Sequence, residues 1–484
     1  MEERNSKQNK ALVAVIATVA ATGGLLFGFD TGVISGAIPF FQKAFNIDNS
    51  WIEIITTSGL VGAVIGAMFS GRIADNIGRK KVILAAGIIF IIGALWSGAS
   101  SSAVMLMFAR FFIGIAIGVS SFAAPLYIAE ISPTKSRGTL VSMFQLLITI
   151  GIMVSYMSDS AFAVPDNSPD FTSAWRPMFY VGVIPALIMF IGMLFLPETP
   201  RWLISKGHEQ KCREVLEKVE EPQLVEEVIV KMKQDIETDR QNKVDWKSIF
   251  QKWLRVPLFI AAGIMFVQQF TGINTIIYYS PKIFLMSGFA DAKAAVWASV
   301  SVGVVNVAFT ILSLFMIDRL GRRKLYFIGL AGMIVALAAL GILFANQASL
   351  SASLKWVTIS LVWVYIAFFA ISLGPLGWLI ISEVFPLSVR GIGSSIGALS
   401  NWLFNAVVAF TFFKIVRLLT LPGTDIVQNG TNLGNPAGAF ILYALVGVAG
   451  LIWGYFYIPE TKHVTLEKIE EHWRLGKMPR ELKQ

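Results

Sequence analysis

The sequence is poor in cysteine and in charged residues. Cys212 is its one cysteine, and Asp, Glu, Lys and Arg make up 15% of its 484 residues. A single cysteine excludes an intrachain disulfide and argues against a metal site built from cysteines. Soluble domains carry about 25% charged residues, so this chain has too few to cover the several cores that its length would need in water. The composition therefore fits a lipid bilayer as its solvent.

The formal net charge of +9 is distributed in a way that argues against nucleic acid as a partner. The basic residues fall in short clusters between apolar runs and form no basic arm or stripe. Such clusters flank transmembrane segments on the cytoplasmic side. They include residues 79–81, the stretch 198–255, residues 319–324 and the tail after Glu460. This distribution predicts that both termini are cytoplasmic.

Hydrophobic residues make up 55% of the chain and gather in long runs. A transmembrane helix needs about 20 mostly apolar residues, and twelve runs reach that length: 11–41, 52–72, 82–101, 104–131, 138–161, 174–196, 256–286, 294–317, 325–346, 356–384, 391–418 and 437–458. The first run is longer than the apolar region of a signal peptide, so we interpret it as an uncleaved span. The sequence predicts an all-α membrane protein with twelve transmembrane helices.

Three motifs occur twice, in the same order. DNIGRK at 75–80 returns as DRLGRR at 318–323, the pair Glu130 and Arg137 returns as Glu383 and Arg390, and PET at 197–199 returns at 459–461. Each motif follows the second, fourth or sixth span of its half, which indicates a parallel duplication of six spans with the substrate site between the halves. We expect a first half at 1–196, a linker at 197–254, a second half at 255–458 and a tail at 459–484. Linker and tail are predicted to form short cytoplasmic helices that pack together.

Together these motifs resemble those of the sugar porters of the major facilitator superfamily, over almost the full chain. The matching segments are residues 71–81, 197–201, 268–274 (QQFTGIN), 374–378 (GPLGW) and 459–462. The pattern is most similar to that of bacterial proton-linked xylose and galactose symporters. Asn76 departs from it, because the family usually has Arg there, as Arg319 is in the second half.

Side-chain amides are candidates for binding a sugar. An amide offers both donors and an acceptor to hydroxyl groups, and amides that face hydrocarbon are costly. Gln268, Gln269 and Asn274 crowd one span beside Thr271 and Gly272, where the helix can loosen. For this cluster we favour substrate binding over the alternative, hydrogen bonding between helices.

The resemblance implies a larger set of sugar-site residues. It adds the amides Gln145, Asn306 and Asn401 and the aromatic residues Phe27, Phe369 and Trp378. Trp378 follows Gly374 and Pro375, where we expect a break in the tenth span. The resemblance also implies that Tyr278 and Tyr279 form an outer gate. The site carries no charged group, which favours a neutral monosaccharide.

Asp30 and Arg110 are the only charged residues that we place well inside the hydrocarbon. Each costs about 2.5–3.5 kcal/mol at the centre of a transmembrane helix, so we expect them to pair. The residues alone leave two interpretations open, a static pair that fixes helix register and a proton-coupling device. The resemblance favours coupling, because proton-linked members carry Asp at the place of Asp30.

Charged residues repeated in both halves are expected to form a latch on the cytoplasmic side. We predict that salt bridges across the halves join the following residues: Asp75, Arg79, Glu130 and Arg137 with Asp318, Arg322, Glu383 and Arg390. The alternative is helix capping combined with topology signals.

These features predict proton-coupled import of a hexose or pentose by a multi-pass protein of the cell membrane. The proton is a co-substrate, no cofactor or metal is expected, and the protein is no enzyme. One chain is expected to suffice, because two halves make a complete pathway. A passive uniporter stays open as an alternative, and a sugar sensor that does not transport is the alternative from another class.

Overall fold

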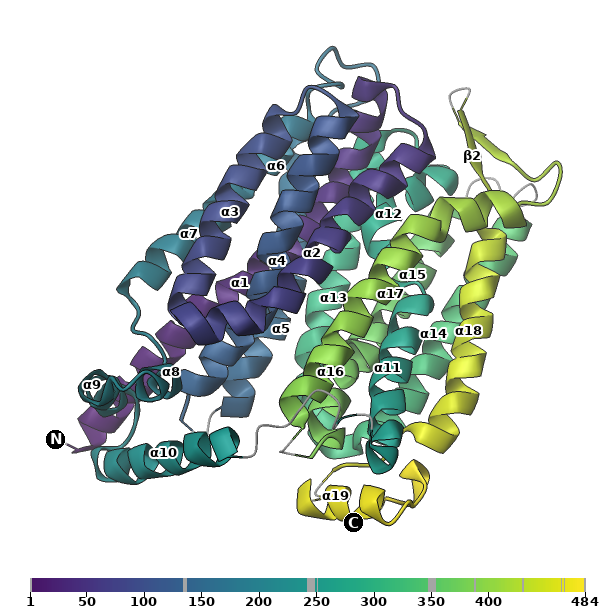
Figure 1. Cartoon of the computed structure of the whole chain (residues 1–484). Coiled ribbons are helices and arrows are strands. Elements are labelled where there is room, and N and C mark those ends of the chain that lie inside the picture. The colour runs from purple at the N-terminus through teal and green to yellow at the C-terminus, as the bar shows by residue number, and fades with distance from the viewer. Residues whose placement is uncertain are drawn as a thin grey trace.

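The protein is built from helices in two groups (Figure 1). The computed structural model describes residues 2–133, 137–241, 249, 251–346, 354–386, 389–428, 431–462, 464 and 466–482. The first group contains α1 (Glu2–Phe45), α2 (Asn49–Ile77), α3 (Arg79–Ala99), α4 (Ala103–Ile131), α5 (Arg137–Phe162), α6 (Trp175–Val181) and α7 (Val183–Phe195). Short helices follow: α8 (Pro200–Ser205), α9 (Glu209–Val219), η1 (Pro222–Leu224), α10 (Val225–Gln241) and η3 (Lys252–Leu254).

The second group repeats the architecture of the first. It contains α11 (Arg255–Phe270), α12 (Ile273–Met286), α13 (Ala292–Leu320), α14 (Arg322–Ala345), α15 (Leu354–Ile371), α16 (Leu373–Val384), α17 (Arg390–Leu419) and α18 (Ala437–Tyr457). A two-stranded antiparallel hairpin, β1 (Ile426–Gln428) and β2 (Thr431–Gly434), precedes α18, and α19 (Leu466–Arg474) and η5 (Pro479–Glu481) follow it. The first group is called the N half below and the second the C half.

The twelve predicted transmembrane spans are confirmed as helices. In the described part of the chain, twelve helical segments are long and apolar enough to cross a membrane. Their ends differ from those of the predicted runs by only a few residues. Most of these differences arise because a helix continues beyond its apolar stretch. The fold is the predicted twelve-helix architecture in two halves.

Three of the spans are interrupted. The seventh breaks between α11 and α12 at Thr271 and Gly272, where Gly272 has a φ of +88°. Such an angle suits glycine because it has no Cβ. The tenth breaks at Ser372, two residues before the predicted break, and the sixth breaks at Gly182, which the sequence did not indicate. Broken helices expose backbone carbonyl groups, and those of the tenth span face the sugar-site candidates described below.

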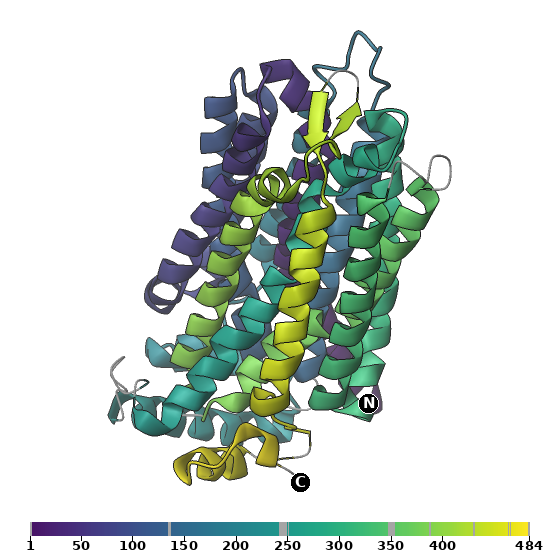
Figure 2. The same ribbon diagram turned by 90° about the vertical axis from the view of Figure 1, so that its right-hand side faces the viewer.

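Both chain ends lie at the same end of the helix bundle, which we call the terminal face. Figures 1 and 2 show α19 near that end and the β1–β2 hairpin at the opposite end, the distal face. The helices α8, α9 and α10 also lie toward the terminal face (Figure 1). The tail contacts the C half: Trp473 Nε1 donates to the carbonyl of Val384 at 2.9 Å, and the Arg474 guanidinium lies 4.3 Å from the Trp253 ring centre. The tail was predicted to pack against the linker helices, and it contacts the last of them, η3.

Close helix packing holds the N half together, and the two most extensive contacts are those of α2 with α4 and of α1 with α5. Glycines at 24, 28, 32 and 36 form a stripe along α1. A methyl group on Gly28 would lie 1.9 Å from the carbonyl oxygen of Ile148, and one on Gly36 would lie 2.3 Å from a carboxyl oxygen of Asp159. Small residues let helix backbones approach closely in lipid, so this stripe fixes the distance between α1 and α5.

Candidate functional site

Four of the predicted amides form one hydrogen-bonded chain between α11, α12 and α17. Asn274 Nδ2 donates to Gln269 Oε1 at 2.6 Å, and Gln269 Nε2 donates to Gln268 Oε1 at 3.2 Å. Asn401 Nδ2 donates to the same Gln268 oxygen at 2.7 Å. Gln268, Gln269 and Asn401 are buried. The predicted cluster of the seventh span is thus brought together with Asn401 of the eleventh.

The break in the tenth span anchors this amide chain. Gln268 Nε2 donates to the carbonyl oxygens of Leu373 at 2.6 Å and Gly374 at 3.3 Å. Both donor hydrogens of Gln268 are therefore used within the protein. Of the chain's two end members, Asn274 keeps its carbonyl oxygen and one N–H that no hydrogen bond within the described residues uses. Asn401 keeps only its carbonyl oxygen there, because its Nδ2 also donates to Met265 Sδ at 3.2 Å. These atoms are the ones that a sugar hydroxyl can engage without breaking the network.

Aromatic rings flank the amide chain from both halves. Phe27 of α1 and Trp402 of α17 have ring centres 4.9 Å apart. Phe369 is half-buried, and a methyl group on Gly374 would lie 3.3 Å from its ring. Trp378 of α16 is 38% exposed. A flat apolar ring suits the C–H face of a pyranose, which the amides cannot cover.

Two predicted site residues lie outside the amide chain. Asn306 of α13 is buried, and Gln145 of α5 is half-buried. Neither makes a hydrogen bond with another amide of the predicted set in the part of the chain that the structure describes. Their place in a sugar site stays a prediction.

Asp30 and Arg110 form the predicted ion pair. Arg110 Nη2 donates to Asp30 Oδ2 at 2.8 Å, and Arg110 Nη1 donates to the second carboxyl oxygen. Both side chains are buried, and the guanidinium lies 5.8 Å from the ring centre of Phe179. A two-point pair of this kind is stronger and more directional than a single charged hydrogen bond.

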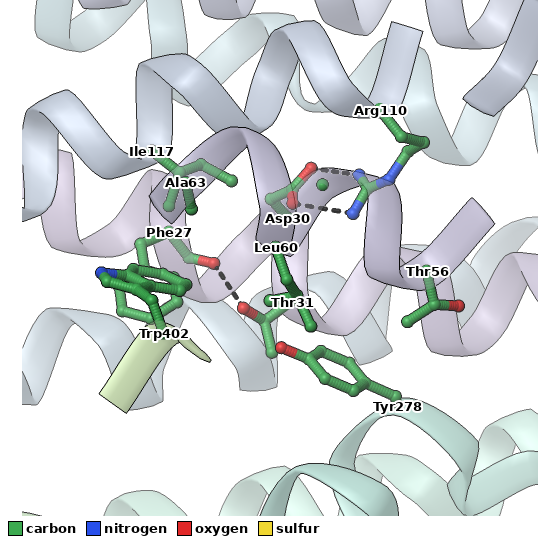
Figure 3. A pocket seen from close by; sticks show the side chains of 11 residues that line it. Phe27, Asp30, Thr31, Thr56, Leu60, Ala63, Arg110, Ile117, Tyr278 and Trp402 are labelled. Carbon is green, nitrogen blue, oxygen red and sulfur yellow. Dashed lines mark hydrogen bonds and ion pairs between the residues drawn. The ribbon is translucent and has the colours of Figure 1, made fainter. Parts of the chain in front are cut away.

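A small pocket connects this ion pair with the rings of Phe27 and Trp402 (Figure 3). Its lining residues come from α1, α2, α4, α12 and α17: Phe27, Asp30, Thr31, Thr56, Gly59, Leu60, Ala63, Arg110, Ile117, Tyr278 and Trp402. Figure 3 shows Phe27 against Trp402 at one end and the Asp30–Arg110 pair at the other. The charged pair and the Trp402 ring, which is next to Asn401 of the amide chain, therefore line the same pocket.

The two predicted gate tyrosines lie where α12 meets α17. Tyr279 Oη donates to the carbonyl oxygen of Ala409 at 2.9 Å, and Tyr278 Oη accepts from Asn405 Nδ2 at 3.3 Å. The Tyr279 ring stacks on Phe412 at 5.2 Å between centres. Both tyrosines are buried, toward the distal face from the amide chain. They hold α12 against α17 on that side of the site.

Glu53 of α2 joins the N half to α17. Its Oε1 accepts from the backbone N–H groups of Phe413 at 2.8 Å and Lys414 at 3.3 Å, and its Oε2 accepts from Lys414 Nζ at 2.5 Å. The i−4 carbonyl for the Phe413 N–H is that of Ala409, the one that Tyr279 engages. Glu53 and Tyr279 therefore contact the same turn of α17.

Further contacts between the halves lie in the same distal region. Tyr156 Oη donates to the carbonyl of Ile277 at 2.7 Å, and the hydroxyl oxygens of Ser35 and Ser280 are 3.4 Å apart. Lys282 Nζ donates to Gln42 Oε1. Among the described residues, the hydrogen bonds and ion pairs between the halves all lie on the distal side of the amide chain. We call this set, together with Glu53, the distal closure.

Comparison with known proteins identifies the family. The family profile described as sugar (and other) transporter matches residues 16–473. This chain belongs to the sugar transporter family. It is 36% identical to the galactose–proton symporter of Escherichia coli K12, over 99% of this chain and 98% of that one, and 32% identical to the arabinose–proton symporter of the same strain, over 99% and 97%. The inward-open structure of the E. coli xylose transporter XylE aligns with a TM-score of 0.79 and 28% identity, covering 95% of this chain and 100% of that one.

The repeated charges of this sugar transporter pair within each half, in contrast to the predicted bridges across the halves. Arg79 bonds to Asp75 at 2.9 Å and to Glu130 at 3.1 Å, and Arg322 bonds to Glu383 at 2.8 Å. The physical reason is that each Arg begins a helix next to the end of the helix that carries the Glu of the same half. In this conformation the predicted bridges between halves are therefore not formed among the described residues.

The other three residues of the predicted latch are Asp318, Arg390 and Arg137. Asp318 lies in the last turn of α13, and Arg390 Nη2 donates to the carbonyl of Phe385 at 3.5 Å. Arg137 begins α5, and its side chain lies outside the described residues, as do residues 134–136. A role for the set as a latch stays a prediction.

Two glutamates that the sequence showed only as a repeated motif cap helices of the transporter. Glu198 accepts from the N–H groups of Arg79 and Lys80, each at 3.1 Å. Glu460 accepts from those of Arg322 at 3.0 Å and the next residue at 3.2 Å. Helix N-termini favour negative charge. Burial nevertheless raises the pKa of Glu198, and the backbone N–H donors oppose this effect.

Buried charges beyond Asp30 and Arg110 were missed in the sequence. Glu53, Asp159 and Lys282 are all at most 5% exposed. Each lies within two turns of the end of a predicted span, where a charge is expected to reach water. Tertiary packing distinguishes them: Glu53 and Lys282 contact the other half, and Asp159 is covered by α1. Trp402 was missed too, although it directly follows the predicted Asn401.

Proposed function

We propose that the protein is a proton-coupled importer of a neutral monosaccharide, a hexose or a pentose, that works by alternating access. The family establishes sugar transport, and the proposal adds the ion that drives it and the class of substrate. The observation that carries the proposal is the buried Asp30–Arg110 pair in a pocket that ends at Trp402, beside the amide chain.

Recognition rests on uncharged groups. Asn274, Asn401, Asn306 and Gln145 present amide donors and acceptors, and Phe27 with Trp402 supplies an apolar wall. Sugar hydroxyls need such paired donors and acceptors, whereas an anionic substrate would need a cation in the amide chain. The relatives whose names state galactose, arabinose and xylose are consistent with this class.

Proton coupling follows from the competition for the Asp30 carboxylate. While Asp30 is ionised, Arg110 holds it by two hydrogen bonds and neutralises it away from water. A proton on Asp30 removes its charge and weakens the pair, which leaves the guanidinium free to turn. Asp30 and Arg110 line the same pocket as Trp402. Binding of sugar beside Trp402 and binding of a proton to Asp30 therefore both alter the lining of this pocket. The link between the two substrates is this shared pocket.

Transport requires that the distal closure opens. The contacts of Glu53, Tyr156 and Ser35 with the C half lie on the distal side of the site, so the halves are held together there. Exchange of this closure for one at the terminal face exposes the sugar site to the distal side. The predicted latch residues are the candidates for that second closure. With the basic loops inside, the distal face is extracellular and transport through it is import.

The test is sugar-driven proton uptake in proteoliposomes, followed with a pH-sensitive dye for a panel of hexoses and pentoses. Alkalinisation of the medium with one sugar is expected for the parent. Asp30→Asn is expected to abolish proton uptake and uphill accumulation while labelled sugar still exchanges. Asp48→Asn, the same substitution at an exposed carboxylate, is the matched control. If labelled sugar equilibrates without moving protons, the protein is a uniporter and the ion pair is structural.

A further inference from the structure

Asp159 is a buried carboxyl group that no hydrogen bond satisfies. It lies near the distal end of α5 and is 0% exposed. Neither Oδ1 nor Oδ2 has a hydrogen-bond partner in the part of the chain that the structure describes. Buried carboxylates in proteins are paired or accept several hydrogen bonds, because an uncompensated charge is strongly unfavourable away from water. In this conformation Asp159 is therefore neutral and holds a proton.

The packing of α1 explains why water does not reach this carboxyl group. Gly36 lies directly against it, so that even a methyl group on Gly36 would come within 2.3 Å of Asp159 Oδ2. The stripe of glycines that brings α1 onto α5 thus covers Asp159 with backbone. Backbone N–H groups in the middle of α1 already donate to carbonyl groups of their own helix. The helix face covers the carboxyl group and offers it no donor.

Other ionisable groups in the distal region are bound elsewhere or lie on other faces. Helices α1, α4, α6 and α13 pack on α5. With α12, these helices and α5 itself carry the following ionisable residues toward the distal face: Asp30, Lys43, Arg110, Tyr156, Arg176, Tyr180, Tyr278, Tyr279, Lys282 and Lys293. Asp30 and Arg110 bond to each other, and Lys282 bonds to Gln42. Lys43 and Arg176 donate to the backbone carbonyls of Asp166 and Gly98, the former at 3.3 Å and the latter at 2.8 Å.

The position of Asp159 connects it with the opening of the transporter. Tyr156, one turn earlier on α5, bonds to the Ile277 carbonyl of the C half. Ser35, the residue before Gly36, faces Ser280 of the C half. Both contacts belong to the distal closure and must break when the distal side opens. Water then reaches the faces of α1 and α5 that flank the carboxyl group.

We propose that Asp159 is a proton-binding site of the distal closure, separate from the Asp30–Arg110 pair. Closing transfers one proton from the distal water to a carboxyl oxygen of Asp159, and opening returns it to the same side. The site therefore adds no proton to the transport stoichiometry, but it makes closure depend on the distal pH. The proposal rests on the alternating access proposed above and not on the identity of the sugar or on symport.

A direct test is infrared spectroscopy of the purified protein without sugar, which detects the carbonyl stretch of protonated carboxyl groups. At neutral pH we expect this band in the parent, in Asp30→Asn and in the control Asp48→Asn, and its loss in Asp159→Asn. An unchanged band in Asp159→Asn overturns the proposal. Absence of the band from both the parent and Asp30→Asn also overturns it, and this outcome can be read even if Asp159→Asn does not fold. No sugar is needed, so the result is independent of the proposed function.

A functional test uses exchange of labelled sugar at equal pH on both sides. Asp30→Asn serves as the background, because it removes titration of the coupling pair. In this background we expect the ratio of closed to open protein to fall by up to about tenfold per pH unit between the titration range of Asp159 in the open state and that in the closed state, and exchange to change with it. The double variant with Asp159→Asn is expected to exchange at a rate independent of pH in that range. Retention of the pH dependence by the double variant overturns the proposal.

Discussion

Replacement of Glu53 by Gln is expected to open the distal side. In the closed state the Glu53 carboxylate accepts two backbone N–H groups of α17 and the Lys414 ammonium. A hydrogen bond to a charged group contributes about 1.5–3 kcal/mol and one to a neutral group about 0.5–1.5 kcal/mol. Gln keeps the size and one acceptor oxygen, so Glu53→Gln removes the difference, about 1–1.5 kcal/mol.

The ion pair with Lys414 adds a smaller amount. The Lys414 side chain is 48% exposed, and pairs with such access to water contribute about 0.2–1 kcal/mol. Together the losses amount to about 2 kcal/mol. Since about 1.4 kcal/mol is tenfold in an equilibrium constant, the ratio of open to closed protein is expected to rise about 30-fold.

Cysteine labelling from the distal side measures this ratio. Ser35 is 0% exposed and faces Ser280, so Ser35→Cys reacts with an impermeant maleimide only when the distal side opens. Cys212→Ser removes the native thiol. The labelling rate is expected to rise about 30-fold with Glu53→Gln and to stay unchanged with Glu209→Gln, a half-exposed Glu on α9. A labelling rate of Glu53→Gln equal to that of the parent would refute the argument that Glu53 holds the halves together.

Three other predictions concern the sugar site, helix packing and the native thiol. Asn401→Ala removes the partner of Gln268 and one sugar contact, so sugar affinity measured by calorimetry is expected to fall by about 10-fold or more, as for loss of a 1–3 kcal/mol buried bond; unchanged affinity excludes Asn401 from the site. Gly28→Ala places a methyl group against backbone and is expected to lower the melting temperature, because overpacking costs about 1–3 kcal/mol, whereas Gly138→Ala, with nothing within 4 Å, is not. Burial raises the pKa of Cys212 to about 11, so maleimide labelling of native protein at neutral pH is expected to be slow, and to become fast only as pH approaches that value; rapid labelling at neutral pH contradicts this.

The sequence was sufficient for the parts of the molecule that depend on composition and on local order. Apolar runs determine the twelve spans, and Gly272 marks the break of the seventh because its conformation is a local property. The charged pair Asp30 and Arg110 was predictable because two opposite charges within hydrocarbon have few alternatives to pairing. The amide cluster of the seventh span was predictable because amides that face hydrocarbon are costly.

Features that depend on how the halves meet were not predictable. Glu53 looks like a charge near the end of a span until α17 of the C half covers it, and Asp159 does so until α1 packs against it. The repeated Arg79 and Arg322 were expected to bridge the halves, but each pairs with the Glu of its own half. A sequence repeat shows that two positions are equivalent. It does not show whether an Arg pairs with the Glu of its own half or with the equivalent Glu of the other half. That choice depends on the conformation.

The amide chain has a consequence for the return of the unloaded carrier. Gln268 and Gln269 satisfy each other, Asn401 and the carbonyls of the tenth span without any ligand. An unloaded site of this kind has few stranded dipoles, so the barrier to reorientation without cargo stays low. A sugar is then expected to gain bonds mainly with the free groups of the end members Asn274 and Asn401, which predicts modest affinity and rapid release. The expected consequence is a carrier suited to high turnover rather than to scavenging traces of sugar.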